Sequence, residues 1–228
     1  MKTPDATPED DVGLLVRALR ASGASTCLIL GPSGAGKTTL AEAVAGRMRT
    51  NRPDERPLCV SLDDFILSGR ERRTRGLAYR AQPGSHDVAA LRGFLRDVRA
   101  DQGDITLPRF DKSRDEPGPV ERVRLPVSLL LFEGWFQYEE FLPEFDLVIY
   151  LDLPLELARE RRLDREARLR DATGGGFSRQ AMIHFWDEVL EPGVERWVAP
   201  LKTRADLVLT YDAAGALVRH ESRAQLAE

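Results

Sequence analysis

The sequence predicts an α/β fold, a doubly wound parallel sheet with helices on both faces, and three observations support this. Short runs of continuous apolar residues recur along the chain, as is typical of strands buried on both faces. Segments with the spacing of amphipathic helices separate these runs. The first run leads into a glycine-rich turn and a helix, the arrangement of a loop that binds phosphate. The 228 residues suit one domain, which we expect to cover residues 1–228.

The composition narrows the class of protein. The apolar share is 42% and the charged share 31%, as in ordinary globular proteins. The net charge of −4 weighs against general nucleic-acid binding, which favours a basic domain. No apolar run reaches the length that crosses a membrane, and the acidic start MKTPDATPEDD lacks the apolar core of a signal peptide. Cys27 and Cys59 are predicted to be reduced core thiols in neighbouring strands. We therefore expect a cytoplasmic protein without a membrane partner.

The amino-terminal elements follow from local patterns. Asp10–Ala21 has its apolar residues at helical spacing. Ser25–Leu30 (STCLIL) is an apolar run that ends at Gly31, as a buried strand would, and a helix is predicted over Gly36–Met48. A second strand is predicted at Leu58–Leu62, after a turn region that contains Asn, Pro and Asp.

The middle of the chain is less regular. Residues 63–85 are rich in Arg, Gly and Pro, and we expect a long irregular loop, which in a compact domain is usually functional. His86–Ala100 returns to helical spacing, and Ile105–Leu107 is predicted to be a short strand. Residues 108–125 are predicted to form a second functional loop.

The carboxyl-terminal half supplies the remaining elements. Val127–Phe132 (VSLLLF) and Leu147–Leu151 (LVIYL) are predicted to be strands buried on both faces, and Leu207–Thr210 is predicted to be the last strand. Between these strands we expect an arginine-rich helix, Leu155–Asp171, and a helix over Ser178–Leu190 whose first residue is the N-cap.

Residues 31–38 (GPSGAGKT) match the P-loop pattern at every fixed position, between an apolar strand and a helix. The glycines let backbone N–H groups turn inward and cradle phosphate oxygens at a helix N-terminus. Lys37 is predicted to bridge the β- and γ-phosphates of ATP, and Thr38 to offer its hydroxyl to Mg²⁺. We assign phosphate binding to Gly31, Ser33, Gly34, Ala35, Gly36, Lys37, Thr38 and Thr39.

A second acidic element is expected to hold Mg²⁺ with Thr38. Glu133 follows the predicted strand Val127–Phe132, and ligands of parallel sheets sit at the carboxyl ends of the strands. Asp63, at the end of the second strand, is the third predicted metal ligand. A solvated strand-end Glu133 stays open as the alternative.

The remaining motifs select among P-loop proteins. Guanine-specific GTPases carry an Asn-Lys-x-Asp motif, but the only asparagine here is Asn51, which Arg52 follows. Transporter ATPases carry a Leu-Ser-Gly-Gly-Gln signature, of which residues 67–70 (LSGR) are a poor match. Small-molecule kinases need a carboxylate near the acceptor hydroxyl and an arginine-bearing lid. The sequence contains both features.

The carboxylates are Asp63 and Asp64, at the carboxyl end of the second strand. Alternation along an extended chain points them in different directions. We predict that Asp63 accepts the proton of the acceptor hydroxyl as the oxygen attacks phosphorus, while Asp64 caps or binds locally. A plain pair of helix-capping residues is the alternative.

The predicted lid covers residues 155–176. Arg161, Arg165 and Arg168 share one helical face, and they are predicted to bind the nucleotide. One of them is expected to close onto the γ-phosphate, and Arg165 is the one assigned to catalysis, although the sequence does not decide which arginine meets that phosphate. The glycines at 174–176 favour a hinge. Ion pairing with acidic neighbours on a solvated face is the alternative.

Taken together, the P-loop, residues 61–65 (SLDDF), Glu133-Gly134 and the arginine helix resemble the uridine kinase, phosphoribulokinase and pantothenate kinase superfamily. Three strings are similar to strings in the plant and fungal type of D-glycerate 3-kinase, and they are 82–87 (QPGSHD), 107–113 (LPRFDKS) and 132–136 (FEGWF). The resemblance covers roughly residues 25–152 and implies ATP-dependent phosphorylation of glycerate or a related hydroxy acid.

These strings suggest how an acceptor is bound. Arg109 and Lys112 could hold an anionic acceptor by a bidentate contact and a point charge. His86 could contact the substrate or be structural. The full predicted acceptor set is Asp63, Asp64, His86, Asp87, Arg109, Asp111, Lys112 and Glu133. The arginines of the first loop could reach an anionic substrate or be solvated loop charges, and we expect solvation for most of them; they are Arg70, Arg72, Arg73, Arg75 and Arg80.

The sequence departs from the glycerate kinases after Ser113, where residues 114–119 (RDEPGP) replace their Gly-Arg-Gly-Asp-Arg type segment. We predict an ATP-dependent small-molecule kinase, a transferase acting on a hydroxyl of a small anionic metabolite. A nucleoside or sugar kinase of the same superfamily, a regulatory nucleotide-binding module and a kinase of a polymer are the alternatives. Trp186 and Trp197 lie in a helical tail that either packs on the core or forms a homodimer face.

Overall fold

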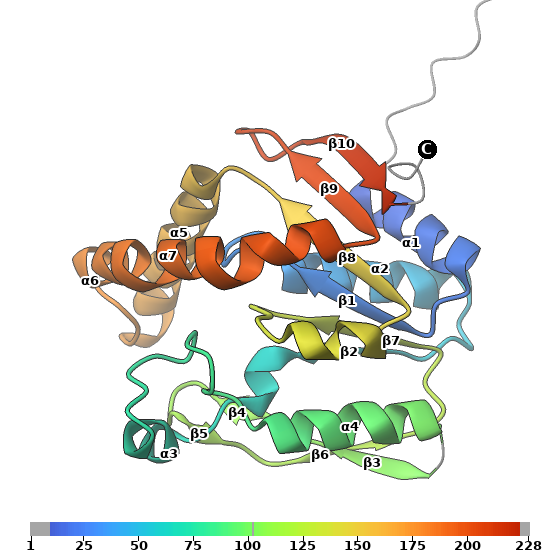
Figure 1. Cartoon of the computed structure of the whole chain (residues 1–228), viewed down its shortest axis with the longest axis horizontal. Coiled ribbons are helices and arrows are strands. Elements are labelled where there is room, and N and C mark those ends of the chain that lie inside the picture. The colour runs from blue at the N-terminus through green and yellow to red at the C-terminus, as the bar shows by residue number, and fades with distance from the viewer. Residues whose placement is uncertain (1–9, 102, 224–228) are drawn as a thin grey trace, which may run out of the picture.

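The structure, a computed structural model, describes residues 10–101 and 103–223 and is built around a six-stranded sheet (Figure 1). The strand order is β10-β9-β8-β1-β7-β2. Five strands run parallel, and β10 pairs antiparallel with β9. The strands span Thr26–Leu30 (β1), Pro57–Ser61 (β2), Leu129–Glu133 (β7), Leu147–Asp152 (β8), Leu207–Tyr211 (β9) and Leu217–Ser222 (β10). The predicted doubly wound α/β fold is confirmed.

Continuous apolar runs form the central strands because both faces of the sheet are covered. Every residue of β1 and of β7 is buried. Alternate residues of β1 enter different cores, with Leu28 and Leu30 on one face and Cys27 and Ile29 on the other. α4 (Val88–Ala100) covers the first face, and α1 (Asp11–Ser22) and α2 (Lys37–Asn51) cover the second.

The helices begin where the sequence offers a cap. Asp10 accepts a hydrogen bond from Gly13 N at the start of α1 (2.6 Å), and Asp87 accepts one from Ala90 N at the start of α4 (2.9 Å). Ser178 caps α6, as predicted. The chain continues from α6 through consecutive helical turns, whose bounds are Arg179–Phe185 (α6), Trp186–Leu190 (η3), Glu191–Gly193 (α7), Val194–Val198 (η4) and Ala199–Arg204 (η5). Trp186 is 1% exposed, so it packs in the core.

Short elements fill the stretches that we expected to be irregular. Ser68 and Glu71 form a capping box that begins a short helix, α3. The described residues form two small antiparallel ribbons, β3–β6 and β4–β5. β4, β5 and β6 lie within the second predicted loop, while β3 confirms the short strand predicted at Ile105–Leu107. The short helical elements are Leu62–Phe65 (η1), Gly69–Thr74 (α3) and Glu139–Glu144 (η2). The short strands are Asp104–Leu107 (β3), Phe110–Asp111 (β4), Glu116–Pro117 (β5) and Glu121–Arg124 (β6).

Two predictions need correction. Cys27 in β1 and Cys59 in β2 are free thiols, but β7 separates their strands. The two strands that are consecutive in the chain are not neighbours, because β7 enters the sheet between them. The prediction also missed β10, whose side chains are mostly polar and are exposed or half-buried. Within the described ranges, none of the helices combines the length and apolar character that a membrane span requires.

The strand order brings three chain segments to one edge of the sheet. β1, β7 and β2 are adjacent and parallel, so their carboxyl ends meet. These ends lead into the P-loop, Glu133-Gly134 and η1, respectively. Residues that are about 30 to 100 positions apart therefore share one edge.

Candidate active site

The phosphate loop is shaped by backbone conformations that favour glycine. Gly34 and Gly36 have φ of +87° and +91°, in a region that other residues rarely adopt. A Cβ at Gly34 would also overlap the carbonyl oxygen of Ala158, at the start of α5 (Leu155–Thr173). Gly36 lacks a side chain, so no side-chain cap occupies the N-terminus of α2. The first N–H groups of α2 can therefore be offered to an anion.

Lys37 is buried at this helix start. Its Nζ donates hydrogen bonds to Gly31 O (3.0 Å) and Pro32 O (2.8 Å). Burial lowers the pKa of Lys37 to about 8, although the carboxylates of Glu133 and Asp63 favour its charged form. Lys37 therefore lies within electrostatic range of the carboxylates at the ends of β7 and β2.

Thr38 and Glu133 form the predicted metal pair. Thr38 Oγ1 donates a hydrogen bond to Glu133 Oε1 (3.0 Å), and Glu133 is 6% exposed. Hydroxyl and carboxylate oxygens are the ligands that Mg²⁺ accepts, and Mg²⁺ in kinase sites takes one or two carboxylates together with substrate phosphates. The pair fits that donor chemistry. No group of three His, Cys, Asp or Glu suited to a metal occurs among the described residues.

Asp63 lies in η1 and pairs with Lys112 Nζ (2.7 Å), and its place among the metal ligands stays a prediction. Burial alone would raise the pKa of Asp63, but Lys112, His86 and Lys37 outweigh it and the pKa is lowered. Asp63 is therefore held as the carboxylate, which is the state that a proton acceptor needs.

Asp64 has other partners. Its carboxylate accepts a hydrogen bond from Ser61 N (3.3 Å) in a capping box and pairs with Arg109 Nη1 (2.8 Å). Burial raises the pKa of Asp64, and Arg109 opposes that rise. Asp63 and Asp64 thus take different partners, as expected, but in a 3-10 turn and not along an extended chain.

The two cations predicted to bind an anionic acceptor are already paired. Arg109 Nε and Nη2 both donate to Glu121 Oε2 (3.0 and 2.6 Å), and its Nη1 donates to Asp64. Lys112 pairs with Asp63, but the Lys112 side chain is 63% exposed. Arg109 is therefore held by two carboxylates, whereas Lys112 has one partner and room to move.

Most of the first-loop arginines are exposed, as expected, and they are Arg70, Arg73 and Arg75; Arg72 and Arg80 are the exceptions. Arg72 is 4% exposed, and both guanidinium groups bond to the carboxylate of Asp115. The reason is that the second loop folds onto α3, a contact between segments far apart in the sequence.

His86 is 3% exposed, and its Nδ1 lies 2.8 Å from the hydroxyl of Tyr138, a partner that sequence reasoning missed. Burial lowers the pKa of His86 to about 4, although Asp63 opposes this shift. Asp87 and Asp111 use their carboxylates locally, Asp87 as the α4 cap and Asp111 in a turn with Ser113 N and Oγ (2.9 and 2.6 Å).

The three arginines of the predicted lid have different surroundings. Arg165 is close enough to Lys37 to disfavour its charged form, whereas Arg161 contacts the β9–β10 turn, where a Cβ on Gly215 would overlap its guanidinium. Arg168 is exposed. Arg162, not among the predicted ligands, is mostly buried, pairs with Glu166 and lies within electrostatic range of Asp63. The i, i+4 spacing of Arg162 and Glu166 was the sequence signal that could have indicated this ion pair.

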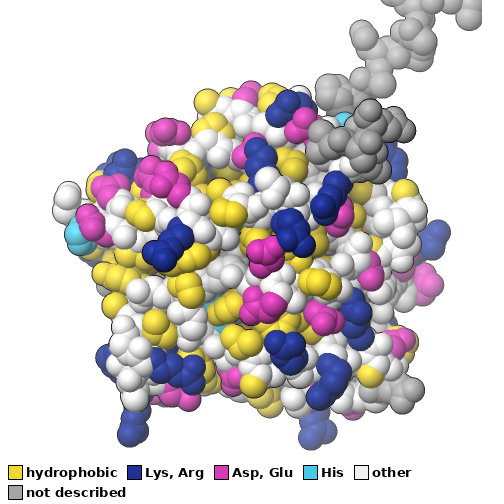
Figure 2. Space-filling view, in the orientation of Figure 1, with side chains coloured by type: hydrophobic (Ala, Val, Ile, Leu, Met, Phe, Trp, Pro, Cys, Tyr) yellow, Lys and Arg dark blue, Asp and Glu magenta, His cyan; other side chains and the backbone are white. Residues whose placement is uncertain are grey.

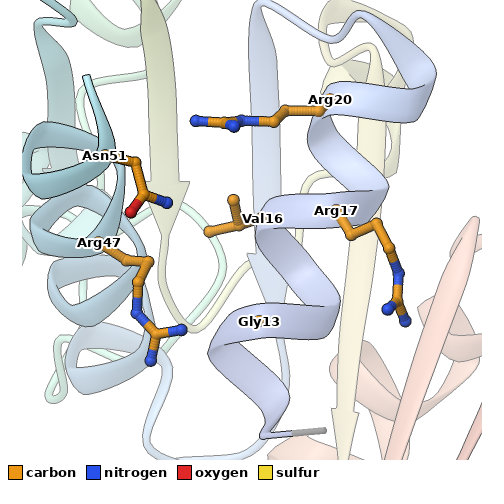
Figure 3. A pocket seen from close by; sticks show the side chains of 6 residues that line it. All are labelled: Gly13, Val16, Arg17, Arg20, Arg47 and Asn51. Atoms are coloured by element: carbon orange, nitrogen blue, oxygen red, sulfur yellow. The ribbon is translucent and has the colours of Figure 1, made fainter.

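Two surface hollows lie apart from this edge. One, of about 280 Å³, lies between α1 and α2 and is lined by Gly13, Val16, Arg17, Arg20, Arg47 and Asn51 (Figure 3). Arg20 and Asn51 extend toward each other across it, while Arg47 pairs with Asp10 (2.9 Å) and Arg20 with Glu55 (3.8 Å). The other, of about 290 Å³, is lined by α4 and η2 residues. The P-loop lies at the opposite end of α2 from Arg47 and Asn51.

The buried imidazole predicts a pH dependence of stability. Because the folded chain lowers the pKa of His86 from 6.5 to about 4, the unfolded chain binds a proton between these pH values and the folded chain does not. The free energy of unfolding should therefore fall by up to about 3 kcal/mol as pH drops through this window.

Chemical denaturation at pH 4 to 7 would measure this effect. His86→Asn should show a shallower pH slope than the wild type, whereas exposed His184→Asn should keep the wild-type slope. Equal slopes in all three proteins would contradict the expectation.

Comparison with known proteins agrees on one family. The sequence model described as the phosphoribulokinase/uridine kinase family matches residues 28–213. A pantothenate kinase of Limosilactobacillus fermentum is 26% identical, over 84% of this chain and 71% of its own. Uridine-cytidine kinase B of Dictyostelium discoideum is 25% identical, over 79% of this chain and 72% of its own. A solved D-glycerate 3-kinase from Cryptococcus neoformans has a TM-score of 0.73 at 18% identity, covering 92% of this chain and 96% of that chain; this likeness concerns the fold.

Proposed function

Because the chain belongs to the phosphoribulokinase/uridine kinase family, we propose that it transfers the γ-phosphate of ATP to a hydroxyl of a small hydroxy acid such as glycerate. The chain is a P-loop kinase, an ATP-dependent phosphotransferase that acts on a small-molecule hydroxyl. The contact between Asp63 and Lys112 (2.7 Å) carries the finer proposal. This contact places a proton acceptor, Asp63, beside an exposed ammonium, that of Lys112. A hydroxy acid has a hydroxyl that suits the first and a carboxylate that suits the second.

The chemistry follows from these partners. The carboxylate of the acceptor replaces Asp63 as the ion-pair partner of Lys112. The hydroxyl of the acceptor then faces the released carboxylate of Asp63. The hydroxyl oxygen forms a bond to the γ-phosphorus as the bond from phosphorus to the β–γ bridging oxygen breaks; the proton passes to Asp63 and ADP leaves. Lys37 and Arg165 offset the charge that spreads over the transferred group.

Mg²⁺ belongs to the same proposal. Thr38 and Glu133 would hold it, on the strength of their contact and their oxygen donors. When bound, the ion supplies charge neutralisation of the phosphates.

The names of the relatives are divided between an acid and a nucleoside, since the first prints pantothenate and the second prints uridine and cytidine. Pantothenate, which the first relative's name prints, is a hydroxy acid like glycerate, and the strings at 82–87, 107–113 and 132–136 resemble glycerate kinases. A neutral nucleoside is the second candidate. It is favoured by the pairing of Arg109 with both Asp64 and Glu121, which offsets the positive charge of this arginine.

A polymer substrate has weaker support. Figure 2 shows one face of the molecule, on which basic and acidic side chains are interspersed and form no single basic patch. A nucleic acid would favour a continuous basic surface.

ADP release with MgATP across an acceptor panel tests the proposal. The panel contains glycerate, other hydroxy acids, pantothenate, sugars, nucleosides and short DNA. We expect one hydroxy acid to raise ADP release well above the slow background. The amide of the same acid, which keeps the hydroxyl but lacks the charge, is the matched control and should be a poorer acceptor.

Turnover with nucleosides alone would favour the second candidate and overturn the first. Absence of any acceptor-dependent turnover would favour a regulatory nucleotide-binding module.

A further inference from the structure

We propose that Arg80 is a specificity-determining residue that binds the carboxylate of the acceptor, and that Arg72 and Asp115 position it for this role. The inference rests on the proposed function and names the cation that reads the acid. It does not follow from the sequence strings, which pointed to Arg109 and Lys112.

The local charges single out the Arg72–Arg80 pair. Arg72 Nη2 and Arg80 Nη2 both pair with Oδ1 of Asp115, and Arg80 Nε donates to the same atom (2.9 Å). Two guanidinium groups thus share one carboxylate, which leaves one positive charge in excess. Arg109, in contrast, has two carboxylate partners. An anion that enters this loop therefore meets the excess positive charge of Arg72 and Arg80.

Of the two arginines, only Arg80 is accessible. The side chain of Arg72 is 5% exposed, and its Nε donates to Leu67 O (3.2 Å). The side chain of Arg80 is 35% exposed. Arg72 is therefore a positioning residue, while Arg80 can exchange part of its hydrogen bonding for a ligand.

Asp115 is itself fixed. Its φ of +58° lies in the left-handed region, and its carbonyl oxygen accepts a hydrogen bond from Gly69 N (2.7 Å). A Cβ on Gly69 would overlap the Asp115 carboxylate, so the start of α3 and this loop are in tight contact. The carboxylate that orients Arg80 is thus tied to a helix on one side and to Arg72 on the other.

Arg80 also contacts the backbone of Lys112, the residue whose side chain reaches Asp63. Its Nη2 donates to Lys112 O (3.1 Å), and its guanidinium lies 5.1 Å from the ring centroid of Phe110. The side chain of the same Lys112 contacts Asp63 (2.7 Å). A hydroxy acid with its hydroxyl at Asp63 would therefore direct its carboxylate toward Lys112 and Arg80. A guanidinium held in place loses little entropy when it binds.

The test compares wild type with Arg80→Gln, using glycerate, or the best hydroxy acid of the panel, and its amide. We expect the KM for the acid to rise about 10- to 100-fold, as for loss of a hydrogen bond to a charged group. The kcat and the KM for ATP should change little, and the preference for the acid over its amide should shrink by the same factor. Arg80→Lys should restore part of that preference because it keeps the charge.

Arg70→Gln is the matched control, since Arg70 is an exposed arginine of the same loop region and lies on α3, the helix that also carries Arg72; it should keep the wild-type KM. The melting temperature of each variant shows whether it folds. If wild type turns over hydroxy acids and Arg80→Gln keeps the full acid preference, the role of Arg80 is overturned while the proposed function stands. If wild type turns over no hydroxy acid, both fall.

Discussion

Lys37→Met is expected to lower kcat about 100- to 1,000-fold, the loss that follows removal of one group stabilising transition-state charge. In the structure the ammonium is held at the P-loop by Gly31 O and Pro32 O, within range of Glu133 and Asp63. Methionine keeps the apolar stem and removes the charge that would face the γ-phosphate.

The same change should leave stability nearly intact. The pKa of Lys37 is lowered from 10.5 to about 8, and burial is the largest cause. A shift of this size means that the fold disfavours the charge by about 3 kcal/mol. Removal of the charge therefore offsets the two lost hydrogen bonds, and the melting temperature should stay within about 5 °C of wild type.

Steady-state kinetics and thermal unfolding of the same preparations measure both effects. Arg47→Met, on the exposed carboxyl-terminal part of α2, is the control and should keep the wild-type kcat. A Lys37→Met enzyme with kcat within tenfold of wild type would contradict the assignment of Lys37 to phosphate transfer.

Asp63→Asn is expected to lower kcat by about 10²-fold or more, the range for loss of a general base. The amide has nearly the same shape but does not take the hydroxyl proton. It also releases Lys112, whose only ion pair among the described residues is with Asp63. The KM for ATP should change little, because the P-loop contacts of Lys37 remain.

Asp64→Asn gives the comparison, because Asp64 is the adjacent carboxylate but caps η1 and pairs with Arg109. We expect it to lower the melting temperature by several degrees, with a smaller loss of kcat than Asp63→Asn. Equal losses of kcat in the two variants would mean that neither carboxylate is the specific proton acceptor.

Local patterns allowed much of the fold to be predicted. The apolar runs of β1, β7 and β8, the helical segment within His86–Ala100 and the helix start at Ser178 were identified, because burial on both faces and capping depend on residues that are contiguous in the chain. The P-loop needed no tertiary information, since its strand, turn and helix form one segment. Short elements such as β4 and β5 carried too few residues to show a period.

The sequence alone therefore determined the α/β class, the P-loop and the placement of Asp63 and Glu133 after strands. The tertiary structure decided the order β1-β7-β2, which joins these residues at one edge and separates Cys27 from Cys59. It also decided which charges meet, namely Asp63 with Lys112 and Asp115 with Arg72 and Arg80. The physical reason is that strand burial is set by neighbouring residues, whereas the partner of a long charged side chain depends on which distant segments fold against it.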